Sequence, residues 1–253
     1  MAAPLFPERV RALLLDIEGT TTPVDFVYGV LFPFARARVE DFLSRHSAEE
    51  EVASALEALR GQREADAQQF SDLPPWRQDS PAARIASAAA YVQWLIDRDL
   101  KFTALKFLQG RIWESGYRSG ELRGQVYPDV APAFQRWRAQ RRAIAIFSSG
   151  SVLAQKLLFA HSTAGDLTPY IEFYFDTTAG PKQDEQSYRR IAAALTLPPT
   201  DVLFLSDVLA ELEAARRAGM ETALCVRSGG PGAPAPGHNM CIVRTLDEVF
   251  PDS

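Results

Sequence analysis

The sequence predicts an α/β fold, in which a parallel sheet has helices on both faces and an all-helical cap is inserted after the first strand. The run Leu13–Asp16 is apolar until it ends in a carboxylate, which is typical of a parallel strand covered on both faces. Residues 24–124 show helical patterns without a convincing strand. From Gln125 onward, apolar runs alternate with helical segments. Such alternation is typical of a Rossmann-like parallel sheet.

The first strand ends in Asp16, and Glu18 follows two residues later. Ligands of open α/β sheets gather at the carboxyl ends of the strands, and Gly19 allows the chain to turn away sharply. Two carboxylates so close repel each other unless a cation or a proton lies between them. The pair therefore indicates a divalent cation and a carboxylate nucleophile. The structural alternative is that Asp16 caps the next turn while Glu18 is solvated.

Residues 24–124 are expected to form a bundle of helices. The sequence Ser47-Ala48-Glu49-Glu50 matches a capping box and predicts that a helix begins there. Ser80 followed by Pro81 predicts the start of a second helix. A third helix is expected from about Thr103 to Gly116.

The helical block divides a chain of 253 residues, which is long enough for two domains. We expect residues 1–23 and 125–253 to form an α/β core, and residues 24–124 to form a helical cap domain. Because the insertion directly follows the first strand, the cap is expected to lie over the carboxyl edge of the sheet.

The second part of the core is expected to alternate strands and helices. The expected strands are Ala143–Phe147, Ile171–Phe175, Val202–Leu205 and Thr222–Val226. The expected helices are Val130–Gln140, Val152–His161, Asp184–Ala194 and Leu209–Ala218. The segment Gly229–Gly237 is rich in glycine and proline and is expected to be a surface loop. Nucleotide binding is disfavoured, because this loop lacks GxGxxG spacing and no Walker A sequence occurs.

Polar groups follow further strands of the expected sheet. The sequence Ser148-Ser149-Gly150-Ser151 lies between a strand and a helix, where hydroxyls and free N–H groups suit an anion. A plain serine N-cap is the alternative. Lys182 directly precedes another helix, and its ammonium group suits a phosphate oxygen, whereas most exposed lysines are merely solvated.

The strand Val202–Leu205 repeats the pattern of the first strand, because Ser206 and then Asp207 follow its apolar run. Glu211 lies four residues after Asp207, a spacing that can place both on one helix face. Mg²⁺ takes one or two carboxylates together with water and phosphate oxygens, so Asp16 and Asp207 are a sufficient pair.

Composition excludes several classes of function. Hydrophobic residues make up 47% and charged residues 23%, which is typical of a soluble globular protein. The net charge is −5 without a long basic run, so we expect no nucleic-acid partner. Cys225 and Cys241 are the only cysteines and indicate neither a zinc site nor a disulfide framework. No stretch reaches the roughly 20 apolar residues that span a bilayer, and the first residues do not resemble a signal peptide. We expect a cytoplasmic monomer without a membrane partner.

The succession of motifs at the strand ends resembles the four motifs of the haloacid dehalogenase superfamily, and more narrowly those of the enolase-phosphatases (acireductone synthases) of methionine salvage. The superfamily motifs are Asp16–Thr21, Ser148–Gly150, Gly180–Lys182 and Leu205–Asp207. The narrower resemblance also includes Pro23–Val27, Gln155–Phe159 and Phe204–Val208. Most phosphatases of the superfamily carry Asp two residues after the nucleophile, and Glu18 is the enolase-phosphatase pattern. The resemblance covers nearly the whole chain.

The resemblance implies a substrate, a cofactor and a nucleophile. The substrate would be 2,3-diketo-5-methylthiopentyl-1-phosphate, which the family enolises and dephosphorylates to the acireductone 1,2-dihydroxy-3-keto-5-methylthiopentene. Asp16 would attack phosphorus and form an aspartyl-phosphate. One Mg²⁺ per chain would be held by Asp16, Asp207 and Glu18, the last through its backbone carbonyl.

The resemblance also implies roles for the remaining motif residues. Ser148, the Ser149 N–H and Lys182 would hold the phosphoryl oxygens, and the carboxyl group of Glu18 becomes a candidate for proton transfer. One alternative is another capped phosphatase or phosphomutase of the superfamily, which would share these residues and act on a different small phosphomonoester. A phosphate-binding module without catalysis is a second alternative, although the retention of Asp16, Lys182 and Asp207 argues against it.

Overall fold

The structure is a computed structural model that describes residues 5–227 and 240–251, and its contacts divide the chain into two compact units. One unit comprises Met1–Phe26 with Arg123–Ser253, and the other comprises Val27–Leu122. We call them the sheet unit and the helical unit. That the helical unit acts as a cap remains a prediction.

Within the described residues, the sheet unit contains one six-stranded parallel sheet in the order β3-β2-β1-β4-β5-β6. The strands are β1 Ala12–Leu15, β2 Ala143–Phe147, β3 Phe173–Phe175, β4 Val202–Ser206, β5 Glu221–Cys225 and β6 Cys241–Val243. The predicted fold class is confirmed. One short strand, β6, was not predicted, and the expected loop Gly229–Gly237 lies outside the described residues.

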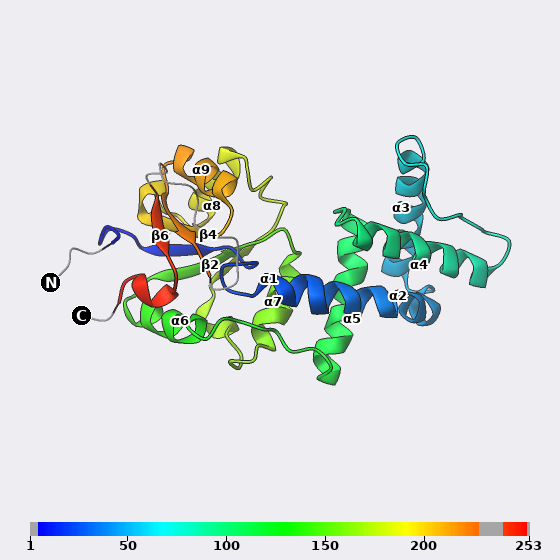
Figure 1. Cartoon of the computed structure of the whole chain (residues 1–253), viewed down its shortest axis with the longest axis horizontal. Helices are drawn as coiled ribbons and strands as arrows, with labels where there is room; N and C mark the ends of the chain where they lie inside the picture. Colours follow the sequence, from blue (N-terminus) through cyan, green and yellow to red (C-terminus); the bar gives the residue numbers. More distant parts are fainter. Residues whose placement is uncertain (1–4, 228–239, 252–253) are drawn as a thin grey trace. The chain divides into compact units, whose positions relative to one another are not determined.

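Helices cover both faces of the sheet: α8 and α9 lie on one face, and α6 and α7 lie on the other (Figure 1). The helices of this unit are α1 Val24–Phe26, α6 Val130–Ala139, α7 Val152–Ala160, α8 Glu185–Ala194 and α9 Leu209–Arg217. The described part of this unit also contains three short 3₁₀ turns, η2 Thr168–Tyr170, η3 Pro199–Asp201 and η4 Leu246–Glu248. The four predicted helices are present, and Asp184 is the N-cap of α8, where its side chain accepts a hydrogen bond from the Gln186 N–H at 3.0 Å.

The strand order places a topological switch point between β1 and β4. The chain leaves β1 toward β2 on one side, whereas β4 pairs with β1 on the other side. Leu15 is the register partner of Leu205, so the residues that follow these two strands emerge side by side. Ligands of open α/β sheets bind outside the carboxyl ends of the strands at such a point.

Apolar side chains pack on both faces of β1. Leu13, Leu14 and Leu15 are all fully buried, and successive strand residues point to opposite faces. Leu14 packs on the face that also contains Tyr188 of α8 and Phe204 of β4. A strand buried on both sides holds the residue after it, Asp16, in a defined position.

The helical unit consists of four longer helices and one π-helical turn among its described residues. These are η1 Val27–Leu31, α2 Phe32–His46, α3 Glu50–Asp66, α4 Pro81–Asp97 and α5 Thr103–Ser119. The predicted cap of α4 is confirmed, because the Ser80 hydroxyl accepts a hydrogen bond from the Ala83 N–H at 3.2 Å. Helix α5 runs beyond Gly116 and ends at Gly120, which has a φ of 78°.

The prediction that Ser47 starts a helix was wrong. Helix α2 extends to His46, and the Ser47 N–H donates to the carbonyl of Leu43, so Ser47 closes the preceding helix. Helix α3 begins only at Glu50, and its N-cap Glu49 makes no side-chain capping bond. The local capping pattern was therefore overridden by the continuation of α2.

Candidate active site

Asp16 lies directly after β1, and its side chain is buried although it is an acid. Its residue is 2% exposed, and its N–H donates to the Leu205 carbonyl at 3.0 Å, which continues the pairing of β1 with β4. The Lys182 ammonium donates to Asp16 Oδ1 at 2.6 Å, and Ser206 Oγ lies 3.4 Å from Oδ2. The carboxylate is thus oriented by groups from two other parts of the sheet unit.

Lys182 is buried between two carboxylates and is not a solvated surface lysine. Its Nζ atom lies 2.6 Å from Asp16 Oδ1 and 2.6 Å from Glu211 Oε2, and the residue is 8% exposed. Burial lowers the pKa of the ammonium group, but attraction to Asp16 and Glu211 outweighs burial and raises the pKa overall. The Tyr188 hydroxyl donates to the Lys182 carbonyl at 2.7 Å and anchors the lysine backbone. Lys182 therefore remains charged in this position.

A tight turn after β1 brings Glu18 and Gly19 to the same edge. The Ile17 carbonyl accepts hydrogen bonds from three successive N–H groups, those of Thr20, Thr21 and Thr22, at 2.9–3.2 Å. Gly19 has a φ of 68°, and a Cβ atom there would lie 2.1 Å from Asp207 Oδ2. Only glycine fits this position, because the turn passes directly against the Asp207 carboxylate.

Asp207 follows β4 and faces the turn from the opposite side. Burial, followed by repulsion from Asp16 and Glu211, raises the pKa of its carboxyl group to about 7. Sequence spacing suggested that Asp207 and Glu211 share a helix face, but α9 begins at Leu209, after Asp207. Glu211 instead turns toward Lys182, and its Oε2 atom also lies 3.0 Å from Ser206 Oγ.

Ser148 follows β2 and is almost completely buried. Its Oγ atom accepts a hydrogen bond from the Gly150 N–H at 3.1 Å and lies 3.5 Å from Glu18 Oε2. The N-cap of α7 is Ser151, whose hydroxyl accepts from the Ala154 N–H at 3.3 Å. Ser148 is therefore not the helix cap. Ser149 lies half-buried in the same turn.

The structure thus brings the predicted site residues to one edge of the sheet. They are Asp16, Glu18, Ser148, Ser149, Lys182 and Asp207. The roles assigned to them from the resemblance remain predictions. Sequence reasoning did not include Ser206 or Glu211 among the site residues, although the spacing of four residues between Asp207 and Glu211 was an available signal.

The donor atoms at this edge fit a hard divalent cation. Asp16 and Asp207 supply carboxylate oxygens, and Glu211 adds further negative charge beside the Lys182 ammonium group. In residues 5–227 and 240–251, no three His, Cys, Asp or Glu side chains form a complete metal cage. A site of two carboxylates completed by water and substrate oxygens is the arrangement that Mg²⁺ commonly uses.

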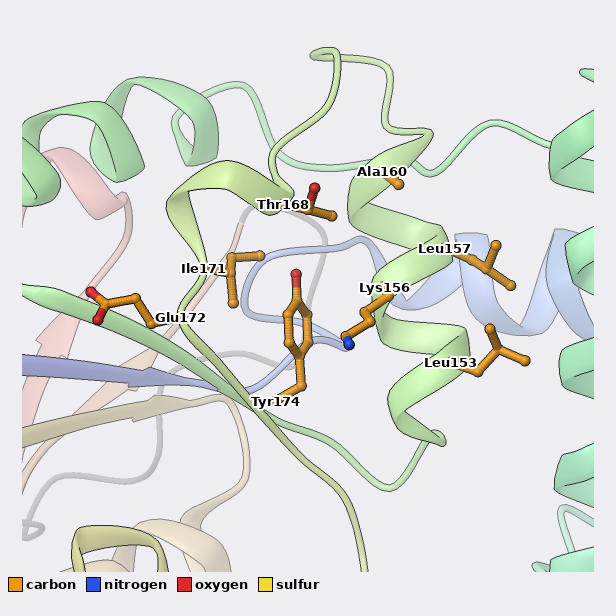
Figure 2. A pocket seen from close by; sticks show the side chains of 8 residues that line it. All are labelled: Leu153, Lys156, Leu157, Ala160, Thr168, Ile171, Glu172 and Tyr174. Carbon is orange, nitrogen blue, oxygen red and sulfur yellow. The ribbon is translucent and has the colours of Figure 1, made fainter. Parts of the chain in front are cut away.

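A separate cavity of about 470 Å³ lies beside α7 and β3 in the sheet unit. Figure 2 shows its lining, in which Lys156 and Tyr174 lie between apolar side chains; the Lys156 ammonium is 5.5 Å from the centre of the Tyr174 ring. None of the residues that line the cavity belongs to the predicted site. The chemistry described above is therefore located at the sheet edge and not in this cavity.

Comparisons with known proteins identify the family of this chain. Residues 10–219 match the family model of the haloacid dehalogenase-like hydrolases. The enolase-phosphatase E1 of Synechococcus elongatus is 56% identical over 96% of this chain and 99% of its own length. That of Azotobacter vinelandii is 47% identical over 87% of this chain and 91% of its own length. The chain belongs to the enolase-phosphatase family.

Members of the enolase-phosphatase family are phosphatases of the haloacid dehalogenase-like class, and this chain is accordingly a phosphatase. A solved structure, the UTR4 protein of Saccharomyces cerevisiae, superimposes with a TM-score of 0.73 at 31% identity. The match covers 93% of this chain and 98% of the yeast chain. Among the described residues, no helix combines the length and apolar character needed to cross a membrane.

Proposed function

We propose that this phosphatase is a Mg²⁺-dependent bifunctional enolase-phosphatase of methionine salvage. It converts 2,3-diketo-5-methylthiopentyl-1-phosphate to the acireductone 1,2-dihydroxy-3-keto-5-methylthiopentene and phosphate. The observation that carries the proposal is the buried Asp16 carboxylate, which is held by Lys182 at 2.6 Å and is followed by Glu18 beside Ser148. Glu18 in place of the more common aspartate, and relatives named enolase-phosphatase E1, support the specific substrate.

In the phosphatase step, an Asp16 oxygen attacks phosphorus while the bond from phosphorus to the alcohol oxygen breaks. The product is an aspartyl-phosphate, which water then cleaves to phosphate and free Asp16. Lys182 orients the carboxylate through its 2.6 Å contact with Oδ1. When bound by Asp16, Asp207 and the Glu18 carbonyl, Mg²⁺ supplies positive charge against the phosphoryl group.

Three groups are proposed to hold the phosphoryl oxygens: Ser148, the Ser149 N–H and Lys182. This anchorage provides binding energy that positions the carbon chain for enolisation. The Glu18 carboxyl group is proposed to move protons, which includes delivering a proton to the departing alcohol oxygen. Its support is that Glu18 Oε2 lies 3.5 Å from Ser148 Oγ and that its side chain reaches one methylene further than aspartate.

The test is product analysis on the diketo-phosphate under nitrogen with the purified chain and Mg²⁺. We expect free phosphate together with the ultraviolet absorbance of the conjugated enediol, without a second enzyme. The Asp16→Asn variant is the negative control and should release no phosphate. If phosphate appears while the carbon skeleton remains a diketone, the chain is another phosphatase of the superfamily. If neither this ester nor p-nitrophenyl phosphate is cleaved, the chain only binds phosphate esters.

A further inference from the structure

A buried arginine outside the predicted site contacts the turn that carries Glu18. Arg227 lies two residues after β5 and is 6% exposed, which is unusual for a cationic side chain. Its Nε and one terminal nitrogen both donate to the Thr20 carbonyl, at 2.9 Å and 2.6 Å. We propose that Arg227 is a positioning residue that holds the Glu18–Thr22 turn so that Glu18 can deliver a proton to the departing oxygen. The inference rests on the role proposed for Glu18.

Two further residues fix the guanidinium group in turn. The Asp129 carboxylate pairs with the other terminal nitrogen of Arg227, and it also accepts a hydrogen bond from the Leu246 N–H at 2.6 Å. The guanidinium carbon lies 4.4 Å from the centre of the Tyr127 ring, and the Tyr127 N–H donates to the Thr21 carbonyl at 3.0 Å. Arg227 and Tyr127 therefore hold two successive carbonyls of the turn, those of Thr20 and Thr21.

The turn has little other support from its own side chains. The hydroxyl groups of Thr20 and Thr22 are buried and have no hydrogen-bond partner among residues 5–227 and 240–251. The Thr21 hydroxyl makes only long contacts, 3.3 Å, with the carbonyls of Asp16 and Ile17. Among the described side chains, Arg227 therefore supplies the charge-assisted hydrogen bonds that hold this turn.

Energetics also favour a positioning role. A buried ion pair such as Arg227–Asp129 recovers little net stability, because removing two charges from water is costly. The pair is thus better explained by the geometry that it imposes. Across the turn, Gly19 contacts the Asp207 carboxylate, and Glu18 approaches Ser148, so a displacement of the Thr20 carbonyl would move both.

The test compares two leaving groups in the Arg227→Lys variant. Lysine keeps the charge but cannot form the two-pronged contact with one carbonyl. p-Nitrophenolate departs without a proton, whereas the butoxide of n-butyl phosphate needs one. With enzyme in excess and Mg²⁺ present, we measure alcohol release from each ester in the first turnover. We expect the ratio of the butyl to the nitrophenyl rate to fall by about tenfold or more, because general acid catalysis typically supplies about 10²–10⁴-fold in rate.

The ratio is independent of the folded fraction, because both rates come from the same sample. Arg142→Lys is the matched control. Arg142 is also buried, donates to the Val10 carbonyl and stacks at 3.6 Å on Phe250, but it lies at the opposite, amino edge of the sheet. We expect this variant to lower the thermal midpoint while leaving the ratio unchanged.

Further variants decide between positioning and general damage. Glu18→Gln should lower the ratio in the same way, and adding Arg227→Lys to it should produce no further loss. Asp129→Asn, which loosens Arg227 from the other side, should lower the ratio even if Arg227→Lys does not fold. An equal fall of both rates in the folded Arg227→Lys or Asp129→Asn protein would overturn the inference and leave the phosphatase assignment intact. If the Glu18→Gln variant has the same ratio as the wild type, the role of Glu18 in the proposed function is contradicted instead.

Discussion

Among the residues that the structure describes, each unit buries one aspartate, and the surroundings of the two differ. Asp66 of the helical unit is 7% exposed, and its two oxygens accept hydrogen bonds from Gln62 at 2.7 Å and from Tyr91 at 2.6 Å. Both donors are neutral side chains of the adjacent helices α3 and α4. Asp16 of the sheet unit is 2% exposed and shares the ammonium group of Lys182 with a second carboxylate.

The difference shows that burial alone does not identify a reactive carboxylate. Asp66 has a donor for each oxygen, and burial together with the hydrogen bond to Asp66 raises the pKa of Tyr91, so the Tyr91 hydroxyl keeps the proton that it donates. Asp16 lies among Glu211 and Asp207 at the end of a strand, where negative charge exceeds positive charge. Such a cluster is costly for stability and indicates a site that binds a cation or an electrophile.

The largest expected effect is that of Asp16→Asn compared with Asp66→Asn. An amide is neither a nucleophile nor a good Mg²⁺ ligand. Asp16→Asn should therefore raise the activation free energy of phosphate release by several kcal/mol, and each increase of about 1.4 kcal/mol slows the rate tenfold. Its thermal midpoint should not fall, because the substitution relieves carboxylate repulsion. Asp66→Asn should show the reverse, a lower midpoint with turnover retained, since one oxygen is replaced by a second donor facing Gln62 or Tyr91. Asp16→Asn turnover above about a tenth of wild type would exclude Asp16 as the nucleophile.

Removal of divalent cations should affect only the Asp16 cluster. We expect a chelator to abolish turnover and Mg²⁺ to restore it, because Asp16 and Asp207 supply the oxygen ligands that this ion takes. Ca²⁺ should bind without comparable turnover, since its larger and looser coordination misplaces the phosphoryl group. The near-ultraviolet signal of the tryptophans should not change with chelation. Full activity in metal-free buffer would contradict the proposed cofactor.

The sequence predicted that the candidate site residues share one sheet edge for a simple physical reason. Asp16 and Ser148 come directly after an apolar run, and Asp207 comes one residue later. Parallel strands bring their carboxyl ends to the same edge of the sheet. The strand order and the switch point between β1 and β4 follow from pairing over long sequence distances, and no local pattern encodes them.

The same dependence on contacts over long sequence distances explains which residues and elements the sequence did not predict. Arg227 donates to the carbonyl of Thr20, which lies 207 positions away in the sequence. Glu211 contacts Lys182 instead of sharing a helix face with Asp207. These pairings depend on how helices and loops pack on the sheet. The short strand β6 has three residues, too few for a recognisable alternation. Ser47 shows the opposite error, in which a valid local pattern loses to the preceding helix.

A smaller effect is expected from Tyr91→Phe, which tests the structural nature of the Asp66 network. Loss of the hydroxyl leaves a buried carboxylate oxygen without its donor, so the free energy of unfolding should fall by about 1–3 kcal/mol. Tyr28→Phe is the matched control, because its hydroxyl bonds Asp99 at 3.3 Å on the exposed surface and should change stability by no more than about 0.5 kcal/mol. Urea unfolding measures both. Equal losses in the two variants would show that Asp66 does not depend on this hydrogen bond.

The smallest expected effect separates a helix cap that the structure contains from one that only the sequence pattern suggests. Ser80→Ala removes the acceptor for the Ala83 N–H at the start of α4, and should lower the free energy of unfolding by about 1 kcal/mol. Ser47→Ala should cost much less, because α3 starts at Glu50 and its N-cap is Glu49. Alanine at the end of α2 is also a good helix former, which offsets any small loss. Urea midpoints of the two variants, measured side by side with wild type, provide the comparison. If Ser47→Ala is the more damaging change, α3 begins at the capping box after all, and the boundary between α2 and α3 must be redrawn.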